Sequence, residues 1–251
     1  MLHTFFFSPS GATCKYAEAM TDAFGGDSQM INLTNGPCEV ECDLVAGDTV
    51  LLVAPVYAGR IPFLAAELFR QIDGHGMKAI VAVVYGNRDY DDALLELADI
   101  AIAGGFDVIG AGAFVGQHCI FPKVASGRPD KTDLAKAVDF IKQAKESGSL
   151  DLSAIKGNRP YKNAAPVALH PKVNRDKCRE CGKCARECPS GAISVENPRE
   201  TDTDKCIACG RCIAICPDNA RHFGGLKYRM IAPLFEKMCS KRREPEWFIA
   251  E

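Results

Sequence analysis

Several features that define large protein classes are missing from this chain. The longest apolar runs, over residues 49–57 and 79–85, are shorter than the ~18 residues that a membrane-spanning helix needs, so no membrane span is expected. The N-terminus has no basic segment and no cleavage site, which argues against a secretory signal and favours a cytoplasmic location. The motifs G-x-x-x-x-G-K-[ST] and H-E-x-x-H are absent, which argues against a nucleoside triphosphate site and a zinc protease. Lys241-Arg242-Arg243 is too short for a nucleic-acid-binding stripe and is expected to be a solvated tail.

The 251-residue chain otherwise has an ordinary globular composition, with 47% apolar and 25% charged residues. Its net charge of −2 is divided unevenly. Residues 1–150 contain 11 Lys and Arg against 19 Asp and Glu, whereas residues 151–251 contain 19 against 13. The acidic first part and the basic second part are therefore expected to attract one another.

Strand and helix patterns alternate through the first 150 residues. Apolar runs predict five strands, over residues 2–7, 30–33, 48–57, 79–85 and 107–115. Helical patterns follow over residues 11–24, 62–72, 90–104 and 130–146. Because the strands are apolar almost throughout, they are expected to be buried on both faces, and the predicted fold class is α/β with a doubly wound five-stranded parallel sheet. A ligand is expected at the carboxyl ends of these strands.

Composition divides the chain into four parts. Residues 1–148 form the α/β domain, and residues 149–170, with several Gly and Pro and little periodicity, read as a linker. Residues 171–224 are rich in cysteine. Residues 225–251 are expected to form a basic C-terminal tail with a short helix over residues 233–239, and Trp247 and Phe248 are candidates for packing back onto a domain.

Eight of the 13 cysteines lie between residues 178 and 216, whereas Cys14, Cys38, Cys42, Cys119 and Cys239 are scattered. The pattern C-x-x-C-x-x-C-x-x-x-C-P occurs twice, with an offset of 28 residues. Three thiolates with this spacing reach three irons of a cubane, and in a two-cluster arrangement the fourth cysteine of each run ligates the other cluster. The expected ligands are Cys178, Cys181, Cys184 and Cys216 for cluster one, and Cys206, Cys209, Cys212 and Cys188 for cluster two.

Zinc and disulfides are the alternatives for these cysteines. Zinc sites usually combine paired C-x-x-C knuckles across a long spacer and do not need a third cysteine three residues further on. A disulfide framework would spread its cysteines through a short secreted chain. The crowded double run therefore favours iron–sulfur clusters over both.

A second site is expected directly after the first strand. Its sequence, Ser8-Pro9-Ser10-Gly11-Ala12-Thr13, leads into a helix. Backbone N–H groups and the helix dipole favour an anion at such a turn, and hydroxyl groups add neutral donors. Because residues 8–14 contain no Lys or Arg, the turn suits a terminal phosphomonoester without a metal. Many strand-to-helix turns are rich in Ser and Gly without binding a ligand, so this motif alone is weak.

Residues 173–223 resemble a bacterial two-cluster ferredoxin in both cysteine runs and in both Cys-Pro ends. The resemblance implies a small α+β domain with two [4Fe-4S] clusters, which are low-potential one-electron centres, and a role in anaerobic metabolism. Free ferredoxins of this type tend to be acidic, whereas residues 171–224 contain 10 Lys and Arg against 8 Asp and Glu. This departure fits a module tethered to an acidic neighbour.

Residues 1–146 resemble flavodoxins, whose phosphate loop has the pattern [ST]-x-[ST]-G-x-T. The resemblance implies FMN, with its ring held by the loops after the third and fourth strands. Tyr57 and Tyr90 are the candidates for stacking on the ring, although both also suit ordinary packing, and Arg88 would favour the anionic flavin. The expected FMN contacts are Ser8, Pro9, Ser10, Gly11, Ala12, Thr13, Pro55, Val56, Tyr57, Ala58, Gly59, Gly86, Asn87, Arg88, Asp89 and Tyr90.

The loop after the fifth strand carries His118 at the same edge of the sheet. This histidine is a candidate for approaching the flavin or a substrate, but a loop histidine without chemistry is the commoner case. No catalytic residue is assigned.

The two parts together resemble the flavodoxin–ferredoxin fusion family of anaerobic bacteria and archaea. That resemblance implies an electron-transfer protein that relays electrons between FMN and two [4Fe-4S] clusters, with ferredoxin- or flavin-dependent oxidoreductases as redox partners. Two alternatives stay open: an FMN-dependent reductase of a small organic substrate fed by the clusters, and a flavin-free domain that docks a ferredoxin. The sequence does not decide between an electron carrier and an oxidoreductase.

Overall fold

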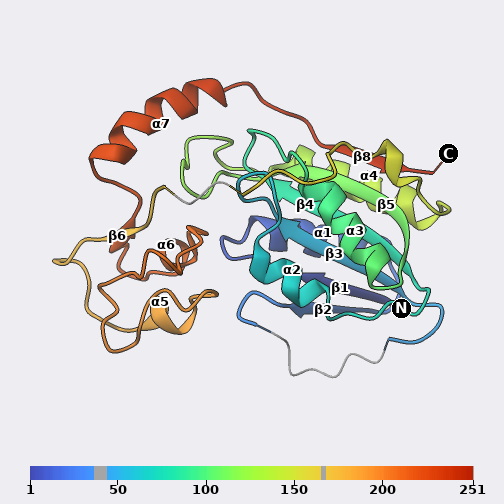
Figure 1. Ribbon diagram of the computed structural model, residues 1–251, viewed down its shortest axis with the longest axis horizontal. Coiled ribbons are helices and arrows are strands. Elements are labelled where there is room, and N and C mark those ends of the chain that lie inside the picture. The colour runs from blue at the N-terminus through green and yellow to red at the C-terminus, as the bar shows by residue number, and fades with distance from the viewer. Residues whose placement is uncertain (37–43, 165–167, 251) are drawn as a thin grey trace.

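The computed structural model describes residues 1–36, 44–164 and 168–250 (Figure 1). Its larger part is a six-stranded sheet in the order β2-β1-β3-β4-β5-β8, in which β8 is antiparallel and the others are parallel. The strands are β1 Leu2–Phe6, β2 Ser28–Asn32, β3 Thr49–Pro55, β4 Lys78–Tyr85, β5 Asp107–Val115 and β8 Glu246–Ile249. The order of the first five strands is that of the flavodoxin-like doubly wound sheet, so the predicted fold class is confirmed.

Helices cover both faces of the sheet (Figure 1). One apolar core joins the sheet to α1 Ala12–Phe24 and α4 Lys131–Lys145, and another joins it to α2 Phe63–Phe69 and α3 Ala93–Ala103. Every residue of β3 is buried, as a strand between two helical layers must be. No helix in the described ranges is long and apolar enough to cross a membrane.

Residues 225–251, expected as a basic tail, contain a helix and the sixth strand. α7 Leu226–Met238 is longer than the predicted helix and includes Pro233. The chain then returns to the sheet, where Trp247 pairs with Gly112 and Phe248 with Ala111. β8 covers the hydrogen-bonding groups that β5 would otherwise present as an edge strand. The predicted five-stranded sheet is therefore extended by one antiparallel strand.

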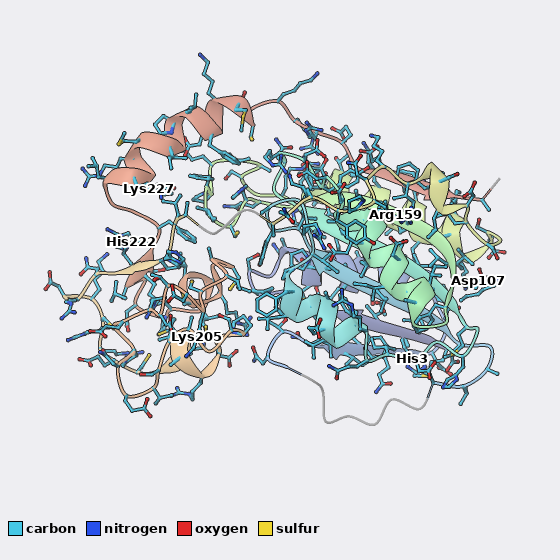
Figure 2. All side chains as sticks on the ribbon, viewed as in Figure 1. His3, Asp107, Arg159, Lys205, His222 and Lys227 are labelled. Atoms are coloured by element: carbon cyan, nitrogen blue, oxygen red, sulfur yellow. The ribbon has the colours of Figure 1, made fainter. Side chains whose placement is uncertain are left out.

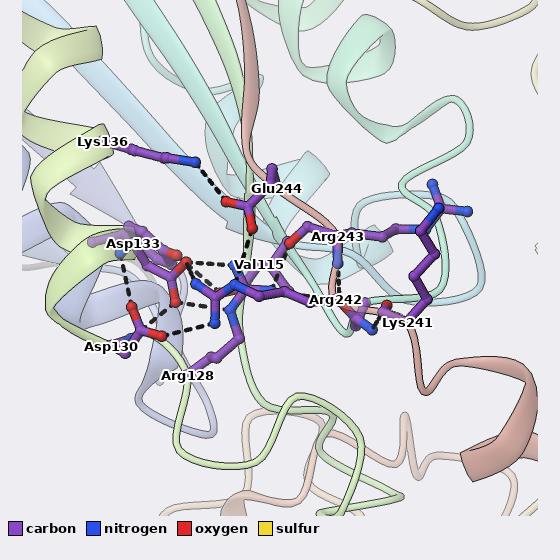
Figure 3. A network of polar contacts seen from close by, with 11 residues as sticks. Val115, Arg128, Asp130, Asp133, Lys136, Lys241, Arg242, Arg243 and Glu244 are labelled. Atoms are coloured by element: carbon purple, nitrogen blue, oxygen red, sulfur yellow. Dashed lines mark hydrogen bonds and ion pairs between the residues drawn. The ribbon is translucent and has the colours of Figure 1, made fainter.

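The segment between α7 and β8 is held on the α/β domain by charged side chains (Figure 3). Arg242 donates to Asp130 at 2.8 Å and to Asp133 at 3.0 Å. Asp133 is also paired with Arg128, and both side chains are almost fully buried. The Asn87 side chain donates to the carbonyl oxygens of Cys239 and Lys241. Lys241, Arg242 and Arg243 are exposed to solvent, as predicted, but the segment is not a free tail, because Arg242 pairs with the acidic start of α4.

The cysteine-rich unit has an internal pseudo-twofold arrangement. β6 Lys172–Val173 pairs antiparallel with β7 Arg221–His222, and the two cysteine runs carry the short helices α5 Lys183–Arg186 and α6 Arg211–Ala214. Gly182 and Gly210 begin these helices in the left-handed region, at φ of 70° and 75°, where a side chain would be strained. The 28-residue sequence repeat is thus a repeat of structure, and Lys205 of its second half lies on the side facing the α/β domain (Figure 2).

The predicted linker contains the short helix η1 Leu152–Ala154, and its residues 158–162 are fixed to α3. Asp92 accepts hydrogen bonds from the backbone N–H groups of Asn158 and Lys162. Asp99 pairs with Arg159. Since α7 and β8 return the chain to the sheet, the cysteine-rich unit is attached to the α/β domain at both of its ends.

Candidate functional site

A cavity of about 340 Å³ lies at the carboxyl ends of the parallel strands, which is where a doubly wound sheet binds its ligand. The loops after β1, β3, β4 and β5 form most of it, and the cysteine-rich unit and α7 complete it. Its volume falls within the roughly 300–1,000 Å³ of small-molecule sites. From the sheet loops it is lined by residues that include Ser10, Ala12, Thr13, Pro55, Val56, Tyr57, Ala58, Tyr85, Gly86, Arg88, Gln117, His118, Cys119, Ile120 and Phe121. The residues that complete it include Ala168, Leu169, Ile207, Ala208, Ile231 and Phe235.

The loop after β1 forms an anion cradle at the start of α1. Gly11 has a φ of 92°, and α1 begins at the next residue with no side-chain cap and no acidic residue in its first turn. The Ser8 hydroxyl accepts a hydrogen bond from the Cys14 N–H at 2.8 Å and so fixes the loop against the helix. The N–H groups of the first turn that precede Cys14, together with an unopposed helix dipole, favour a phosphate. Ser10 and Thr13 line the cavity from this loop.

Tyr57 lies between the cavity and the cysteine-rich unit. Its hydroxyl is buried and has no hydrogen-bond partner. Burial, followed by the nearby thiols of Cys209 and Cys119, raises the pKa of Tyr57 well above its usual value. A buried hydroxyl without a partner is costly unless a ligand completes it, so this atom is consistent with a ligand in the cavity.

Not every predicted flavin contact lines the cavity. Tyr90 is 3% exposed and packs edge-on against Tyr85 with 5.5 Å between ring centroids, so it belongs to the core rather than to the cavity wall. Asn87 holds the C-terminal segment. Gly59 and Asp89 also lie outside the lining, as do Ser8, Pro9 and Gly11, although these last three carry the cradle.

The loop after β5 contributes six consecutive residues to the cavity lining, of which only His118 was a site candidate from the sequence. The Nδ1 atom of His118 accepts hydrogen bonds from the N–H groups of Ile120 at 3.1 Å and Phe121 at 3.2 Å, which places the ring proton on Nε2. The ring packs against Phe121 and Phe235. Burial, and secondarily the charge of Arg88, lowers the pKa of His118 to about 4. His118 is therefore a neutral N–H donor at the cavity, a role that its position after β5 suggested without establishing.

The eight clustered cysteines fall into two groups. Cys178, Cys181, Cys184 and Cys216 line one small cavity, so the last cysteine of the second run joins the first three of the first run. Cys206, Cys209 and Cys212 each lie near enough to the thiol of Cys188 to interact with it electrostatically, and Cys212 also interacts with Cys184. The assignment of the eight cysteines to two crossed ligand sets stays a prediction.

In each half of the repeat, a backbone N–H group donates a hydrogen bond to the sulfur of the fourth cysteine of the run. The Ala220 N–H donates to Cys216 Sγ and the Ala192 N–H donates to Cys188 Sγ, each at 3.3 Å. In the part of the chain that the structure describes, no three His, Cys, Asp or Glu side chains converge closely enough to hold a single metal ion. Four thiols around one small cavity suit a cubane, whose ligands bind different irons.

Comparisons with known proteins agree with both parts. The family described as a flavodoxin domain matches residues 4–93, and the family described as a 4Fe-4S dicluster domain matches residues 170–217. No curated protein matches the chain. The chain thus joins a flavodoxin domain to a 4Fe-4S dicluster domain.

Solved structures similar to the chain include two flavodoxins and a larger oxidoreductase. A flavodoxin from the domain Archaea is 15% identical, with 58% of this chain and 99% of that chain covered and a TM-score of 0.42. The FMN-bound flavodoxin of Fusobacterium nucleatum is 15% identical, with 58% and 96% covered and a TM-score of 0.43. Rubredoxin oxygen:oxidoreductase of the anaerobe Desulfovibrio gigas is 14% identical, with 57% and 35% covered and a TM-score of 0.40. The match therefore spans only about a third of the oxidoreductase.

Proposed function

We propose that the protein relays electrons between an FMN in the cavity and two [4Fe-4S] clusters in the dicluster domain. The observation that carries this proposal is a shared wall: Ile207 and Ala208, which lie between two expected ligands of cluster two, line the cavity at the carboxyl edge of the sheet. A cluster held by this loop would therefore lie next to the cavity, with Ile207 and Ala208 between them. An electron-transfer role follows from the two domains, and the shared wall supports direct exchange between them.

The residues around the cavity fit FMN in two respects. The start of α1 offers backbone N–H groups and no acidic residue in its first turn, which suits the terminal phosphate. Tyr57 offers an aromatic ring and a buried hydroxyl without a partner beside the expected position of the isoalloxazine ring. Gly86 keeps the loop after β4 close to His118, because a Cβ there would lie 2.6 Å from the imidazole Cδ2.

The crossed cysteine sets would hold the clusters, with Cys178, Cys181, Cys184 and Cys216 around cluster one and Cys206, Cys209, Cys212 and Cys188 around cluster two. The Ala220 and Ala192 N–H groups then stabilise thiolate charge at one ligand of each cluster. We assign the flavodoxin domain to residues 1–148 and the dicluster domain to residues 171–224, joined by residues 149–170.

FMN exchanges one or two electrons and each cluster exchanges one, so the pair converts between two-electron and one-electron chemistry. The protein contributes positioning and exclusion of water. Ile231 and Phe235 of α7 close one side of the cavity, and Ile207 and Ala208 close another. His118 presents its Nε2–H at the same cavity as a neutral hydrogen-bond donor.

The walls of the cavity favour the relay over a reductase of a small organic substrate. A reductase needs free space beside the flavin for its substrate, and here α7 and the 206–209 loop occupy that side. We place the relay in the cytoplasm of an anaerobic cell, where reduced thiols and low-potential clusters persist.

The test is the content of acid-released flavin and of iron per chain, on protein purified without oxygen. About one FMN and about eight irons, the content of two cubanes, are expected. Stepwise anaerobic reduction should then bleach flavin and cluster absorbance in the same molecule. Eight irons without flavin, even after incubation with FMN, would contradict the proposed relay. The protein would then be a ferredoxin joined to a flavin-free docking domain.

A further inference from the structure

The two cysteine loops of the dicluster domain share a backbone but differ in chemistry. Glu180 and Ala208, which occupy equivalent places in the repeat, both lie in the left-handed region, at φ of 57° and 50°. The first loop reads Cys178-Arg179-Glu180-Cys181, and the second reads Cys206-Ile207-Ala208-Cys209. Two charged side chains in one loop thus correspond to two apolar side chains in the other.

This difference matches what each loop contacts. Ala208 is 3% exposed and Cys209 is 8% exposed, because the second loop packs against the flavodoxin domain. In the first loop, Arg179, Glu180 and Cys181 are all exposed. Cluster two therefore faces the cavity, and cluster one faces solvent.

The surface around cluster one is basic. Its exposed cations are Arg175, Lys177, Arg179, Lys183 and Arg186, and its exposed acids are Asp176 and Glu180. Arg179 is paired with Asp218, and Glu180 is paired with Arg199. Within the described residues, neither Lys177 nor Lys183 forms an ion pair, although Lys183 is close enough to Glu187 to interact with its carboxyl electrostatically, so both ammonium groups are accessible to a partner. We call the surface formed by Arg175, Lys177, Arg179, Lys183 and Arg186 the basic rim.

We propose that the basic rim is the docking surface for an acidic one-electron carrier protein, and that cluster one is the port through which electrons pass between that carrier and cluster two. This inference rests on the proposed relay. In each reductive step the carrier is oxidised by one electron and cluster one is reduced, after which cluster one is reoxidised as cluster two is reduced. The same surface serves the reverse direction with an oxidised carrier.

The positive charge of the basic rim is the reason for proposing an acidic carrier protein as its partner. Lysine and arginine side chains that surround an exposed redox centre attract an acidic surface and raise the association rate, an effect that salt weakens. The space at cluster one is walled by its own four cysteines and their neighbours, which leaves no room there for a small-molecule substrate. A protein that contacts the exposed loop around Cys181 would also contact the positive side chains of the basic rim.

The experiment compares two charge-reversal variants with the native protein under anaerobic conditions. Lys177→Glu/Lys183→Glu changes the rim, and Lys131→Glu/Lys142→Glu changes two exposed lysines of α4 by the same total charge. The probe is a reduced acidic bacterial two-cluster ferredoxin, and the readout is the second-order rate of cluster bleaching in the rapid-mixing trace. At low salt the rim variant should lose at least tenfold in rate, whereas the α4 variant should stay within about twofold.

Two further readouts separate docking from damage to the cluster. As salt rises, the native and rim-variant rates should converge, because mobile ions screen the rim. The cationic methyl viologen radical should reduce the rim variant as fast as the native protein or faster. Carbodiimide coupling to the ferredoxin should join Lys177 or Lys183, identified by mass spectrometry, and this readout needs no electron transfer.

An unchanged low-salt rate in the rim variant overturns the proposal, and so does a loss that persists at high salt. Coupling confined to Lys227 or Lys237 would instead make α7 the docking surface, because its outer face exposes Leu226, Met230, Leu234 and Met238 beside those lysines. Cluster bleaching and cross-linking do not depend on the flavin. If the protein binds no FMN, the relay fails while the rim is still tested.

Discussion

The thiol of Cys119 lies 3.7 Å from the carbonyl oxygen of Ala208 and donates to it. This contact joins the loop after β5 of the flavodoxin domain to the second cysteine loop of the dicluster domain. Both residues line the cavity. The interface between the domains is therefore also the interface between the proposed flavin and cluster two.

Exchanging the two loop sequences tests that interface. Ile207→Arg/Ala208→Glu gives the second loop the sequence of the first, whose glutamate already adopts the same positive φ. Burying two charges against an apolar wall is unfavourable, so the loop should withdraw, and cluster-to-flavin transfer measured by flash photolysis should slow at least tenfold. The reciprocal variant, Arg179→Ile/Glu180→Ala, should leave that rate unchanged. Equal rates in both variants would mean that the second loop is not the route.

The crossed ligation predicts a specific pattern of iron loss. Cys178→Ser/Cys216→Ser removes two ligands of cluster one and should leave about four irons per chain, in the cluster held by the other set. Cys178→Ser/Cys188→Ser removes one ligand from each cluster and should leave close to none. The opposite pattern would show that each run ligates its own cluster.

Much of this architecture follows from local sequence signals. The β1, β3, β4 and β5 strands are buried almost throughout, and such strands produce continuous apolar runs that are visible in the sequence, whereas the edge strand β2 is mostly exposed. The two cysteine runs are also visible in the sequence, and the predicted crossing of their fourth cysteines comes from the two-cluster arrangement that this spacing is typical of. The cradle at residues 8–13 likewise depends on a single strand-to-helix turn.

The remainder depends on contacts between distant segments. β8 was missed because a four-residue strand at the end of a basic segment is stabilised by pairing with β5, more than 130 residues earlier. Tyr90 was expected in the site, but its side chain packs into the core beside Tyr85. Four residues line the cavity only because distant segments pack against the sheet loops: Ile207, Ala208, Ile231 and Phe235. The apolar Ile207-Ala208 pair, at the place that Arg179-Glu180 occupies in the first copy of the repeat, is a sequence signal for this docking that the predictions from sequence did not use.

The depressed pKa of His118 makes stability depend on pH. The folded value of about 4 lies below the unfolded value of ~6.5. Below pH ~6.5 the unfolded chain therefore binds more protons, and stability falls as the pH decreases toward 4. Between pH 6.5 and 5 the native protein should lose about 2 kcal/mol through this group.

His118→Asn keeps an acceptor for the Ile120 and Phe121 N–H groups but cannot titrate, so its stability should depend less on pH over that range. His75→Asn, at a histidine whose side chain is 72% exposed, is the control and should keep the native slope. Denaturant unfolding at each pH, with matched cofactor content, measures the difference. Parallel slopes for the native protein and His118→Asn would contradict the assignment.

Gly86 is expected to be essential to the shape of the cavity. A Cβ there would meet the imidazole of His118 at 2.6 Å, and two backbone hydrogen bonds hold that ring in place. Gly86→Ala should therefore weaken FMN binding by about tenfold or more, which corresponds to about 1.4 kcal/mol. Gly148→Ala, where an added Cβ meets nothing within 4 Å, should bind FMN as the native protein does. Quenching of FMN fluorescence on titration of flavin-free protein measures both.

The buried pair of Arg128 and Asp133 should govern the stability of the flavodoxin domain. Their side chains are 4% and 0% exposed, and Asp133 also accepts from Arg242, whose side chain is 43% exposed (Figure 3). Asp133→Ala leaves the Arg128 guanidinium buried without its counter-charge, so it should cost about 3–5 kcal/mol. Arg242→Ala removes only the exposed partner and should cost about 1 kcal/mol or less.

Denaturant unfolding of the full chain compares the two variants. A larger loss for Arg242→Ala would mean that attachment of the C-terminal segment, and not the buried pair, limits stability. A larger loss for Asp133→Ala would instead mean that the sheet and α4 are stable without the contact that attaches the segment before β8. In that case hydrogen exchange in Arg242→Ala should rise along β8 while the N–H groups between β4 and β5 stay protected.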